Sequence, residues 1–394
     1  MSYHSIKRED VTVKQQVIDY IEDSREEMLA LWEELVNVES GKDHKVGIDA
    51  LIGKVEDILI AEGFDTKTIP YQQAGNAVIG ESGDKEMEKP IIFIGHVDTV
   101  FPRGFLQEHP FQIKNGKAAG PGILDMKGGV ITILYVVKAL RAVGYHKHPI
   151  KVIIVGDEET AHIHSDAKSM LLEETRNGLY AFNTETGNLE NNLAIGRAGG
   201  SAYELEVRGR ASHTGMDWEN GRNAIIELSH KMIEIDEASD FDAGYTYNVT
   251  IIQGGSAVNT CPDYSKATIG TRCQTKAQQE MMHQKLEEIA AQTFIEGTET
   301  TLTYLGGFDP MEATEENEEL FQVIRATAEE LDMALPKPVV SQGSSDSAYS
   351  TLAGVPTVCS LGPVGEGNHT PNEYAVVESL FERSKLLAVT VLNL

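Results

Sequence analysis

The residues of this sequence best suited to chemistry are imidazoles and carboxylates that follow short apolar runs or stand in Gly-rich loops. Such runs predict strands buried on both faces of a parallel sheet, and ligands bind at the carboxyl ends of strands in open α/β sheets. We therefore expect these side chains to lie close together. They are His96 and Asp98 after IIFIG, Glu158 and Glu159 after KVIIVG, Glu185 after LYAFNT, Asp125 in GPGILDMKGG and His369 in GEGNHTPNE.

This set can supply two imidazoles and three carboxylates as ligands and contains no thiolate. These are the ligand types of a two-zinc site. The spacing of His96 and Asp98 has a mechanical reason, because a carboxylate on the second ring nitrogen holds a metal-binding imidazole in one tautomer. Glu158 and Glu159 diverge as chain neighbours, so one can bind metal while the other handles protons beside a bound water. An HVD triplet or a DEE run alone is often structural, but their joint placement predicts a metal centre.

The acidic balance of the chain argues against two classes of partner. Among 394 residues, 33 Lys and Arg stand against 61 Asp and Glu, which gives a formal net charge of −28. Nucleic-acid backbones and anionic membranes bind clustered Lys and Arg, so neither is an expected partner. With 41% hydrophobic and 24% charged residues, the composition is that of an ordinary globular protein of two or three domains.

Neither a membrane span nor a secretion signal is expected. The longest apolar run covers residues 130–137, far short of the ~20 residues that a membrane-spanning helix needs. The start, MSYHSIKREDVTVKQQ, has no apolar signal-peptide core. Cys261, Cys273 and Cys359 are too widely spaced for a disulfide framework or a Cys-based zinc site. These features predict a cytoplasmic protein with reduced thiols.

Apolar periodicity and turn signals predict two kinds of domain. Strands alternate with helices in residues 1–192 and again in 308–394, which predicts a doubly wound α/β domain; residues 193–307 insert an α+β domain into it. The predicted helices cover residues 11–38, 47–62, 128–144, 222–235, 276–294, 316–331 and 375–392. The predicted strands cover residues 66–71, 76–80, 91–95, 151–156, 179–183, 201–209, 245–253, 266–273, 300–305 and 355–361, with a hairpin at 111–118 turned at Asn115-Gly116.

Six motifs in order resemble the zinc-dependent aminoacylase and carboxypeptidase family. That family includes glutamate carboxypeptidase, acetylornithine deacetylase and succinyl-diaminopimelate desuccinylase. The motifs are GHVDTVFP, GPGILDMKGG, GDEE, the strand-end Glu185, GRASHTG with a following GRNAI, and GNHTPNEY. GHVDTVFP and SLGPVGEGNHT are most similar to the glutamate carboxypeptidase branch.

The resemblance implies a zinc-exopeptidase catalytic domain that holds two Zn²⁺ per chain. Asp125 would bridge the two metals, with His96 and Glu185 completing one site and Glu159 and His369 the other.

The resemblance also implies the remaining roles. Glu158 would be the general base, and Asp98 would orient His96. The inserted domain would be a lid through which two subunits dimerise, with His213 reaching the partner's active site and stabilising the oxyanion. The candidates for binding the substrate, expected to be a small molecule with a free carboxylate, are Asn259, Arg272, Gly343 and Ser344.

The motifs leave the reaction open at one point. A carboxypeptidase releasing C-terminal glutamate-like residues and a deacylase of N-acyl amino acids both break an amide bond next to a carboxylate. A metal-free binding protein of the same fold is a remote alternative, since every ligand and the base are present. The chain departs from the family after its Glu pair, where TAHIHSDAKS replaces a Gly-Ser segment, and His162 and His164 are expected to have loop roles. The glutamate carboxypeptidase branch is often exported, whereas no export signal is expected for this sequence.

Overall fold

The computed structural model describes residues 3–83 and 89–394, with side chains from Thr12 onward. The chain forms two compact units. The first unit contains Met1–Gly196, Ala313–Val340 and Ser345–Leu394, and the second contains Arg197–Glu312 and Ser341–Ser344. The second unit is thus an insertion into the first, and it begins and ends a few residues beyond the predicted boundaries at 192 and 307.

A mixed six-stranded sheet forms the centre of the first unit, in the order β1-β2-β6-β3-β7-β14. β6, β3, β7 and β14 run parallel to one another, and β2 runs antiparallel to both of its neighbours, β1 and β6. Every residue of β3 and β6 is buried, as their continuous apolar sequences predict. The strands are β1 Asp65–Ile69, β2 Gly75–Ser82, β3 Ile91–His96, β6 Ile150–Gly156, β7 Tyr180–Asn183 and β14 Thr357–Val358.

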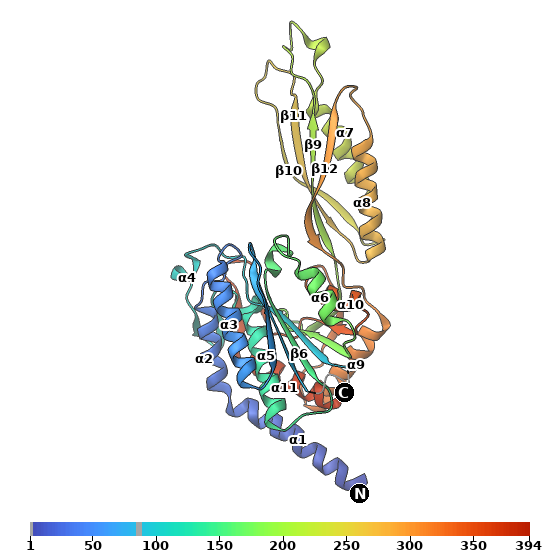
Figure 1. Cartoon of the computed structure of the whole chain (residues 1–394). Helices are drawn as coiled ribbons and strands as arrows, with labels where there is room; N and C mark the ends of the chain where they lie inside the picture. The colour runs from blue at the N-terminus through green and yellow to red at the C-terminus, as the bar shows by residue number, and fades with distance from the viewer. Residues whose placement is uncertain (1–2, 84–88) are drawn as a thin grey trace. The chain divides into compact units, whose positions relative to one another are not determined.

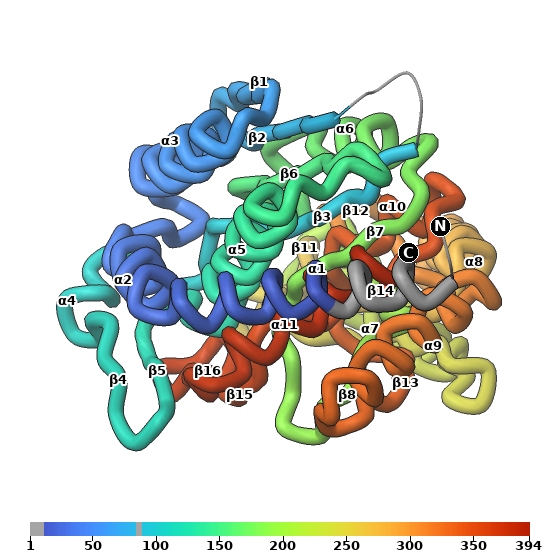
Figure 2. Tube along the Cα trace, turned by 90° about the horizontal axis from the view of Figure 1, so that it is seen from below, coloured from blue at the N-terminus to red at the C-terminus, as the bar shows by residue number. Residues whose placement is uncertain are grey.

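Helices cover both faces of this sheet (Figure 1). The chain moves from β3 to β6 in one direction and from β6 to β7 in the other, and right-handed crossovers therefore place α5 and α6 on opposite faces. The apolar α5 packs against α1 and α11, and Figure 2 shows the three side by side. The helices are α1 Tyr3–Asp23, α2 Arg25–Val36, α3 Lys45–Ala61, α4 Phe105–Glu108, α5 Gly128–Ala142, α6 Ala167–Thr175, α9 Glu315–Glu330, α10 Ser347–Leu352 and α11 Val377–Asn393.

Smaller elements complete the first unit. The predicted hairpin is confirmed, with Asn115 and Gly116 both at positive φ. It forms β4 Gln112–Lys114 and β5 Lys117–Ala119. β5 also pairs with β16 Tyr374–Val376, which in turn pairs with β15 Gly365–Glu366. β8 Asn192–Arg197 pairs with β13 Lys337–Ser341.

Two sequence predictions about the first unit are wrong, and several short elements were missed. The long first helix is interrupted at Ser24, which leaves α1 and α2 as separate helices. The last strand contains only two residues of the predicted 355–361. α6, α10, β8 and β13 were not predicted, because they are short and carry little apolar periodicity.

The second unit is an antiparallel sheet in the order β10-β11-β9-β12, with α7 and α8 on one face (Figure 1). Buried residues alternate with less buried ones along β9 and β11, as expected for strands with one face packed against helices. The elements are β9 Gly200–Arg208, α7 Ala224–Glu237, β10 Thr246–Gly254, β11 Tyr264–Arg272, α8 Lys276–Ala291 and β12 Glu299–Phe308.

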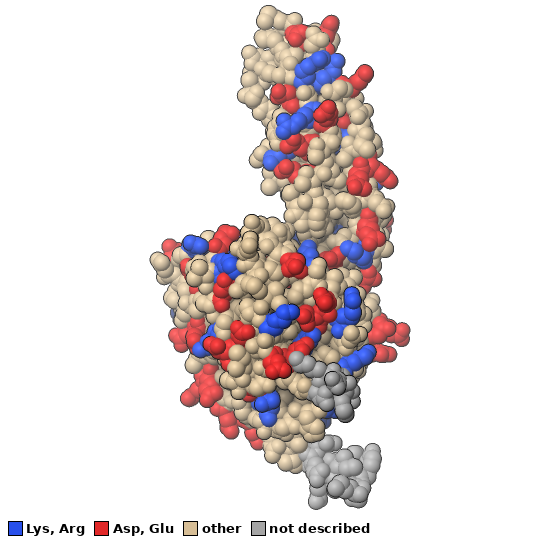
Figure 3. Space-filling view, viewed as in Figure 1, with Lys and Arg blue, Asp and Glu red and all other residues tan. Residues whose placement is uncertain are grey.

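The surface agrees with the composition. On the face shown in Figure 3, acidic side chains are interspersed with basic ones, and the basic side chains do not gather into a continuous patch. Among the described residues, no helix combines the length and apolar character needed to cross a membrane.

The second unit contains a buried ion pair whose loss we expect to be costly. Lys231 Nζ lies 3.1 Å from Glu227 Oε1, and both residues are fully buried. Lys231 also donates to the carbonyl of Ile289 at the end of α8. Lys231→Met should destabilise the protein by ~3–5 kcal/mol, because it leaves a buried carboxylate unpaired.

Denaturant unfolding measures this loss. The matched control is Lys266→Met, which breaks the partly exposed Lys266–Glu204 pair of the same unit and should cost less than ~1 kcal/mol. The double variant Glu227→Gln/Lys231→Met should be more stable than Lys231→Met alone, because it removes the unpaired charge. Equal losses in Lys231→Met and Lys266→Met would contradict this account.

Candidate metal centre

Three parallel strands of the first unit deliver side chains to one edge of the sheet. His96 is the last residue of β3, Glu158 and Glu159 form the turn after β6, and Glu185 lies two residues beyond β7. Since β3 pairs in parallel with both β6 and β7, the carboxyl ends of these strands coincide. The structure therefore brings these predicted residues together.

Asp125 and His369 join the cluster from loops. Asp125 Oδ1 lies 3.3 Å from His96 Nε2, and Asp125 Oδ2 lies 3.2 Å from His369 Nε2. One carboxylate thus has a different imidazole on each oxygen. Each imidazole has a second carboxylate beside it: Glu185 Oε1 is 3.4 Å from His96 Nε2, and Glu159 Oε2 is 3.4 Å from His369 Nε2.

These separations fit two metal sites. Ligand atoms about 2.0–2.2 Å from a tetrahedrally coordinated metal lie roughly 3.3–3.5 Å from one another, whereas charged hydrogen bonds are shorter, at about 2.7–2.9 Å. The four nitrogen–oxygen distances of 3.2–3.4 Å match the tetrahedral edge. The nitrogen and oxygen donors suit zinc, and the arrangement has room for a fourth ligand on each ion.

Asp98 contacts three residues of the cluster through its carboxylate. Its Oδ1 lies 3.3 Å from His96 Nδ1, as the His-x-Asp spacing predicts. The same carboxylate accepts the backbone N–H groups of Glu158 and Glu159, at 3.2 and 2.9 Å. One fully buried side chain therefore fixes both the imidazole of His96 and the turn that carries the two glutamates.

Burial and charge shift the pKa values in the cluster. Burial raises the pKa of Glu158 well above its ordinary value, and the negative charge of Glu185 adds to the shift. Burial also raises the pKa of Glu159, to about 7. Burial disfavours a charged His96, but hydrogen bonds to Asp125 and Asp98 outweigh it and raise the pKa of this imidazole. The carboxylates are crowded enough to attract cations.

Sequence reasoning missed Glu373, which supports Asp125, and the buried Lys127 two residues further along the chain. Glu373 Oε1 accepts the backbone N–H groups of Leu124 and Asp125, at 2.8 and 3.0 Å. The fully buried Lys127 donates to the carbonyl of Val38 at 3.0 Å. The signal for Glu373 was its place in GNHTPNEY, four residues after His369.

Gly129, the second residue of α5, also has a structural reason. A Cβ on Gly129 would lie 1.9 Å from the carbonyl oxygen of Thr184, the residue before Glu185. Only glycine allows the start of α5 to approach the end of β7 this closely. Glu185 is further fixed because its backbone N–H donates to Asn183 Oδ1 at 3.0 Å.

His162 does lie in a loop, but it is buried and bonded on both ring nitrogens. Its Nδ1 is 2.8 Å from Asp157 Oδ1, and its Nε2 is 2.6 Å from Asp346 Oδ1. Because Asp157 precedes Glu158, the imidazole links the glutamate turn to the residue before α10. His164 is exposed.

The second unit places His213 beside Asn259. The N–H of Thr214 donates to the carbonyl of Asn259 at 3.1 Å, and His213 pairs with Thr260 in an antiparallel bridge. His213 Nδ1 accepts the N–H groups of Gly215 and Met216. A neutral His213 therefore carries its proton on Nε2, where it is free to donate.

Arg272 lies at the other end of β11 from these residues. The eight residue steps between Tyr264 and Arg272 correspond to roughly 25 Å of strand. Gly343 and Ser344 lie at the Arg272 end, because their carbonyls accept Arg197 Nη1 at 3.0 and 3.1 Å and the neighbouring Gly199 pairs with Cys273. Within one chain, the predicted substrate-binding residues thus form two separate groups.

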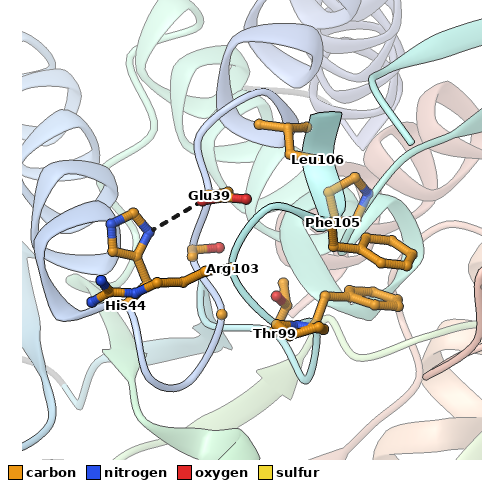
Figure 4. Close-up of a pocket in the computed structure, with 11 residues that line it drawn as sticks. Glu39, His44, Thr99, Arg103, Phe105 and Leu106 are labelled. Atoms are coloured by element: carbon orange, nitrogen blue, oxygen red, sulfur yellow. Dashed lines mark ion pairs between the residues drawn. The ribbon is translucent and has the colours of Figure 1, made fainter. Parts of the chain in front are cut away.

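A small cavity is lined in part by the loop that follows Asp98. Glu39, His44, Thr99 and Arg103 are among the residues that line it, and the Glu39–His44 ion pair of 3.9 Å crosses it (Figure 4). Its volume is about 10 Å³, which is room for a single water molecule. This cavity is too small for a substrate.

Comparison with known sequences decides the family. The sequence model of Peptidase family M20/M25/M40 matches residues 92–393. The chain belongs to this family. This M20 protein is therefore a hydrolase of a metallopeptidase and amidohydrolase family in which metal dependence is typical, and the predicted family is confirmed.

Individual relatives carry several activities in their names. The chain is 27% identical to carboxypeptidase G2 of Pseudomonas sp. (strain RS-16) over 379 residues, which cover 94% of this chain and 90% of that protein. It is 23% identical over 391 residues to succinyl-diaminopimelate desuccinylase of Hydrogenovibrio crunogenus, covering 93% of this chain and 99% of that protein.

Solved structures share the fold at lower identity. Aminopeptidase PepT of Bacillus cereus aligns with a TM-score of 0.76 and 21% identity, covering 93% of this chain and 98% of that one. The M20 metallo-carboxypeptidase Sso-CP2 of Sulfolobus solfataricus aligns at 0.74 and 16% identity, with the same coverage. These structures confirm the predicted fold class.

The His162 link predicts a pH-dependent contribution to stability. Burial disfavours its charged form, but Asp346 and Asp157 outweigh this effect and raise the pKa of His162 from 6.5 to about 10. A raised pKa stabilises the folded protein below the ordinary value, and this stabilisation is lost as the pH rises through 10. His162→Asn should therefore cost ~3–5 kcal/mol at pH 6 and clearly less at pH 10.

Denaturant unfolding of both proteins at the two pH values tests this expectation. The matched control is His164→Asn, two residues along and exposed, which should change stability little at either pH. A pH-independent loss in His162→Asn would show that a neutral imidazole serves equally well.

Proposed function

We propose that this M20 protein is a di-zinc hydrolase that cleaves an amide bond next to a carboxylate, as a glutamate-carboxypeptidase-like metallopeptidase. The observation that carries the proposal is the geometry of Asp125, whose two oxygens each face a different imidazole at 3.2–3.3 Å. A single carboxylate placed in this way is suited to bridge two ions.

The proposed ligands divide into two sets that share Asp125. His96 and Glu185 would hold one Zn²⁺, and His369 and Glu159 the other, in agreement with the distances above. Bound zinc would polarise the substrate carbonyl and make a water molecule more acidic. Asp98 would fix the tautomer and orientation of His96.

Glu158 is proposed as the general base. It lies in the cluster, 4.0 Å from His96 Nε2, but it is absent from the four close nitrogen–oxygen pairs. Its carboxylate would take a proton from the attacking water and return it to the departing amine nitrogen. A raised pKa suits this role, because the group must hold the proton between the two transfers.

Arg272 is proposed to bind the substrate carboxylate. Its guanidinium is exposed and, among its described contacts, donates only to the carbonyl of Thr271. A guanidinium grips a carboxylate with two parallel hydrogen bonds. Gly343 and Ser344, at the same end of β11, would line the substrate pocket.

The separation of the second unit's residues supports a homodimer. His213 and Asn259 lie at one end of β11 and Arg272 at the other, so one active site can use both groups only if they come from different chains. β10 is an edge strand, and its Ile251 and Ile252 are each 54% exposed. Exposed apolar edge strands tend to pair with another chain. We propose that the second unit dimerises and that the Nε2–H of His213 stabilises the oxyanion in the partner's site.

Deacylation of N-acyl amino acids is the second candidate activity. It is favoured by the similarity to succinyl-diaminopimelate desuccinylase, whereas the similarity to carboxypeptidase G2 favours a carboxypeptidase. A hydrolysis screen of C-terminal glutamyl peptides, folate-type conjugates and N-acyl amino acids decides between them. Preferred cleavage of N-acyl amino acids would overturn the carboxypeptidase assignment.

The three cysteines support a cytoplasmic location. Cys261, Cys273 and Cys359 are all free thiols, and unpaired thiols are typical of reducing compartments.

Glu158 and Asp125 should separate catalysis from metal binding. Glu158→Gln should lower activity by ~100-fold or more and keep two zinc equivalents, because the base is not a proposed ligand. Asp125→Ala should lose activity and bind less of both ions, because it removes the shared ligand. Elemental analysis measures the metal; two full equivalents in Asp125→Ala would refute the bridge.

Mixed dimers test the role of His213. His213→Ala and Glu158→Ala should each be nearly inactive alone. After subunit exchange, heterodimers should regain activity, because one of their two sites contains both residues intact. Sedimentation measures assembly, and a monomer, or a dimer without rescue, would contradict the proposal.

Amidated substrates test Arg272. Arg272→Ala should lower kcat/KM by ~100-fold on a substrate with a free carboxylate, the loss expected for a charged hydrogen bond. Arg272→Lys should recover only part, because an ammonium lacks the fork. On the matching amidated substrate the alanine variant should lose little. Equal losses on both substrates would make Arg272 structural.

A further inference from the structure

A second cavity lies in the first unit. Its volume is about 490 Å³, within the range of small-molecule sites. Its walls come from the first half of α11, the chain after α9, the turn at residues 188–191, and Val364 and Val376 beside β15 and β16. None of the residues assigned to metal binding or catalysis lines it.

A buried arginine that lines this cavity has a side-chain nitrogen without a hydrogen-bond partner. Arg383 of α11 is only 4% exposed. Its Nη2 is buried and donates to no hydrogen-bond acceptor. Arg383 also forms no ion pair among the described residues. The adjacent Glu382 is exposed; its negative charge attracts Arg383, but the two side chains form no ion pair. An unpaired buried charge is strongly unfavourable, and burial accordingly lowers the pKa of Arg383 to about 10.

The other charged side chains that line the cavity are paired with another residue or exposed to solvent. Lys385 pairs with Glu22, and Glu378 pairs with Arg25 in a bidentate contact. Arg383 is therefore the cation of this cavity that forms no ion pair among the described residues. A guanidinium presents its donors in a planar fork that matches a carboxylate.

The lining selects the kind of anion. Asp332 and Glu382 contribute two exposed carboxylates to the lining, which would repel a multiply charged ligand such as phosphate more strongly than a monocarboxylate. Apolar side chains cover much of the remaining wall and would receive an aliphatic group; they are Leu189, Leu331, Met333, Val364 and Leu386. We propose that this cavity binds a small monocarboxylate with a short aliphatic chain, whose carboxylate pairs with Arg383.

Thermal unfolding with a matched pair of probes tests the site. The probes are 3-methylbutanoate and its uncharged analogue 3-methylbutanamide, added to the full chain at equal millimolar concentrations. The carboxylate should raise the Tm of the wild type by about 2 °C, and the amide should leave it unchanged. Arg383→Met should abolish the shift.

Two controls separate this site from the metal centre. Lys385→Met removes the other cation of the same cavity and should keep the shift, since Lys385 is paired with Glu22. Carboxylate binding at the metal centre would shift wild type and Arg383→Met alike, and that result would overturn the proposal. An equal shift with inorganic phosphate would overturn the choice of a monocarboxylate.

A measurement on the wild type keeps the test decisive if Arg383→Met does not fold. Crystals soaked in 4-bromobutanoate should show bromine anomalous density in the cavity, with the carboxylate within hydrogen-bond distance of Arg383. Density at the carboxylate cluster alone would reject the site.

Discussion

The crowding of carboxylates at the end of the parallel sheet is the constraint on which the first unit depends. Glu158, Glu159 and Glu185 are held there by strands, and Asp125 joins them from a turn. Buried like charges repel one another strongly, so the arrangement needs cations between its oxygens. Asp98 has a different role: its one carboxylate orients both the glutamate turn and the imidazole of His96. These contacts restrain the glutamate turn and the imidazole of His96, as a metal centre requires.

Part of this centre can be predicted from the sequence because apolar runs reveal where buried strands end. His96 and Glu185 follow such runs, and the parallel sheet does bring them together. Asp125 and His369 stand in loops, whose paths no periodicity reveals; their motifs indicated them, and only the fold shows that they share an edge. The link through His162 could not be predicted, because its partner Asp346 is remote in the sequence.

The fold, like the metal centre, could be predicted from the sequence only in part. Helix and strand interiors follow apolar periodicity, which identified most elements of both units. The break at Ser24 depends instead on local backbone conformation, and the antiparallel direction of β2 depends on its pairing with β6. In the second unit the strands were predictable, but the separation of His213 from Arg272 became visible only through the register of β11. That separation links the proposed chemistry to assembly.

Anomalous diffraction at the zinc absorption edge tests the central claim most directly. Crystals of the full chain grown with Zn²⁺ should contain two anomalous peaks at the end of the parallel sheet. One peak should lie beside His96 and Glu185 and the other beside His369 and Glu159, with a different oxygen of Asp125 bound to each. A single peak, or two peaks that do not share Asp125, would contradict the account.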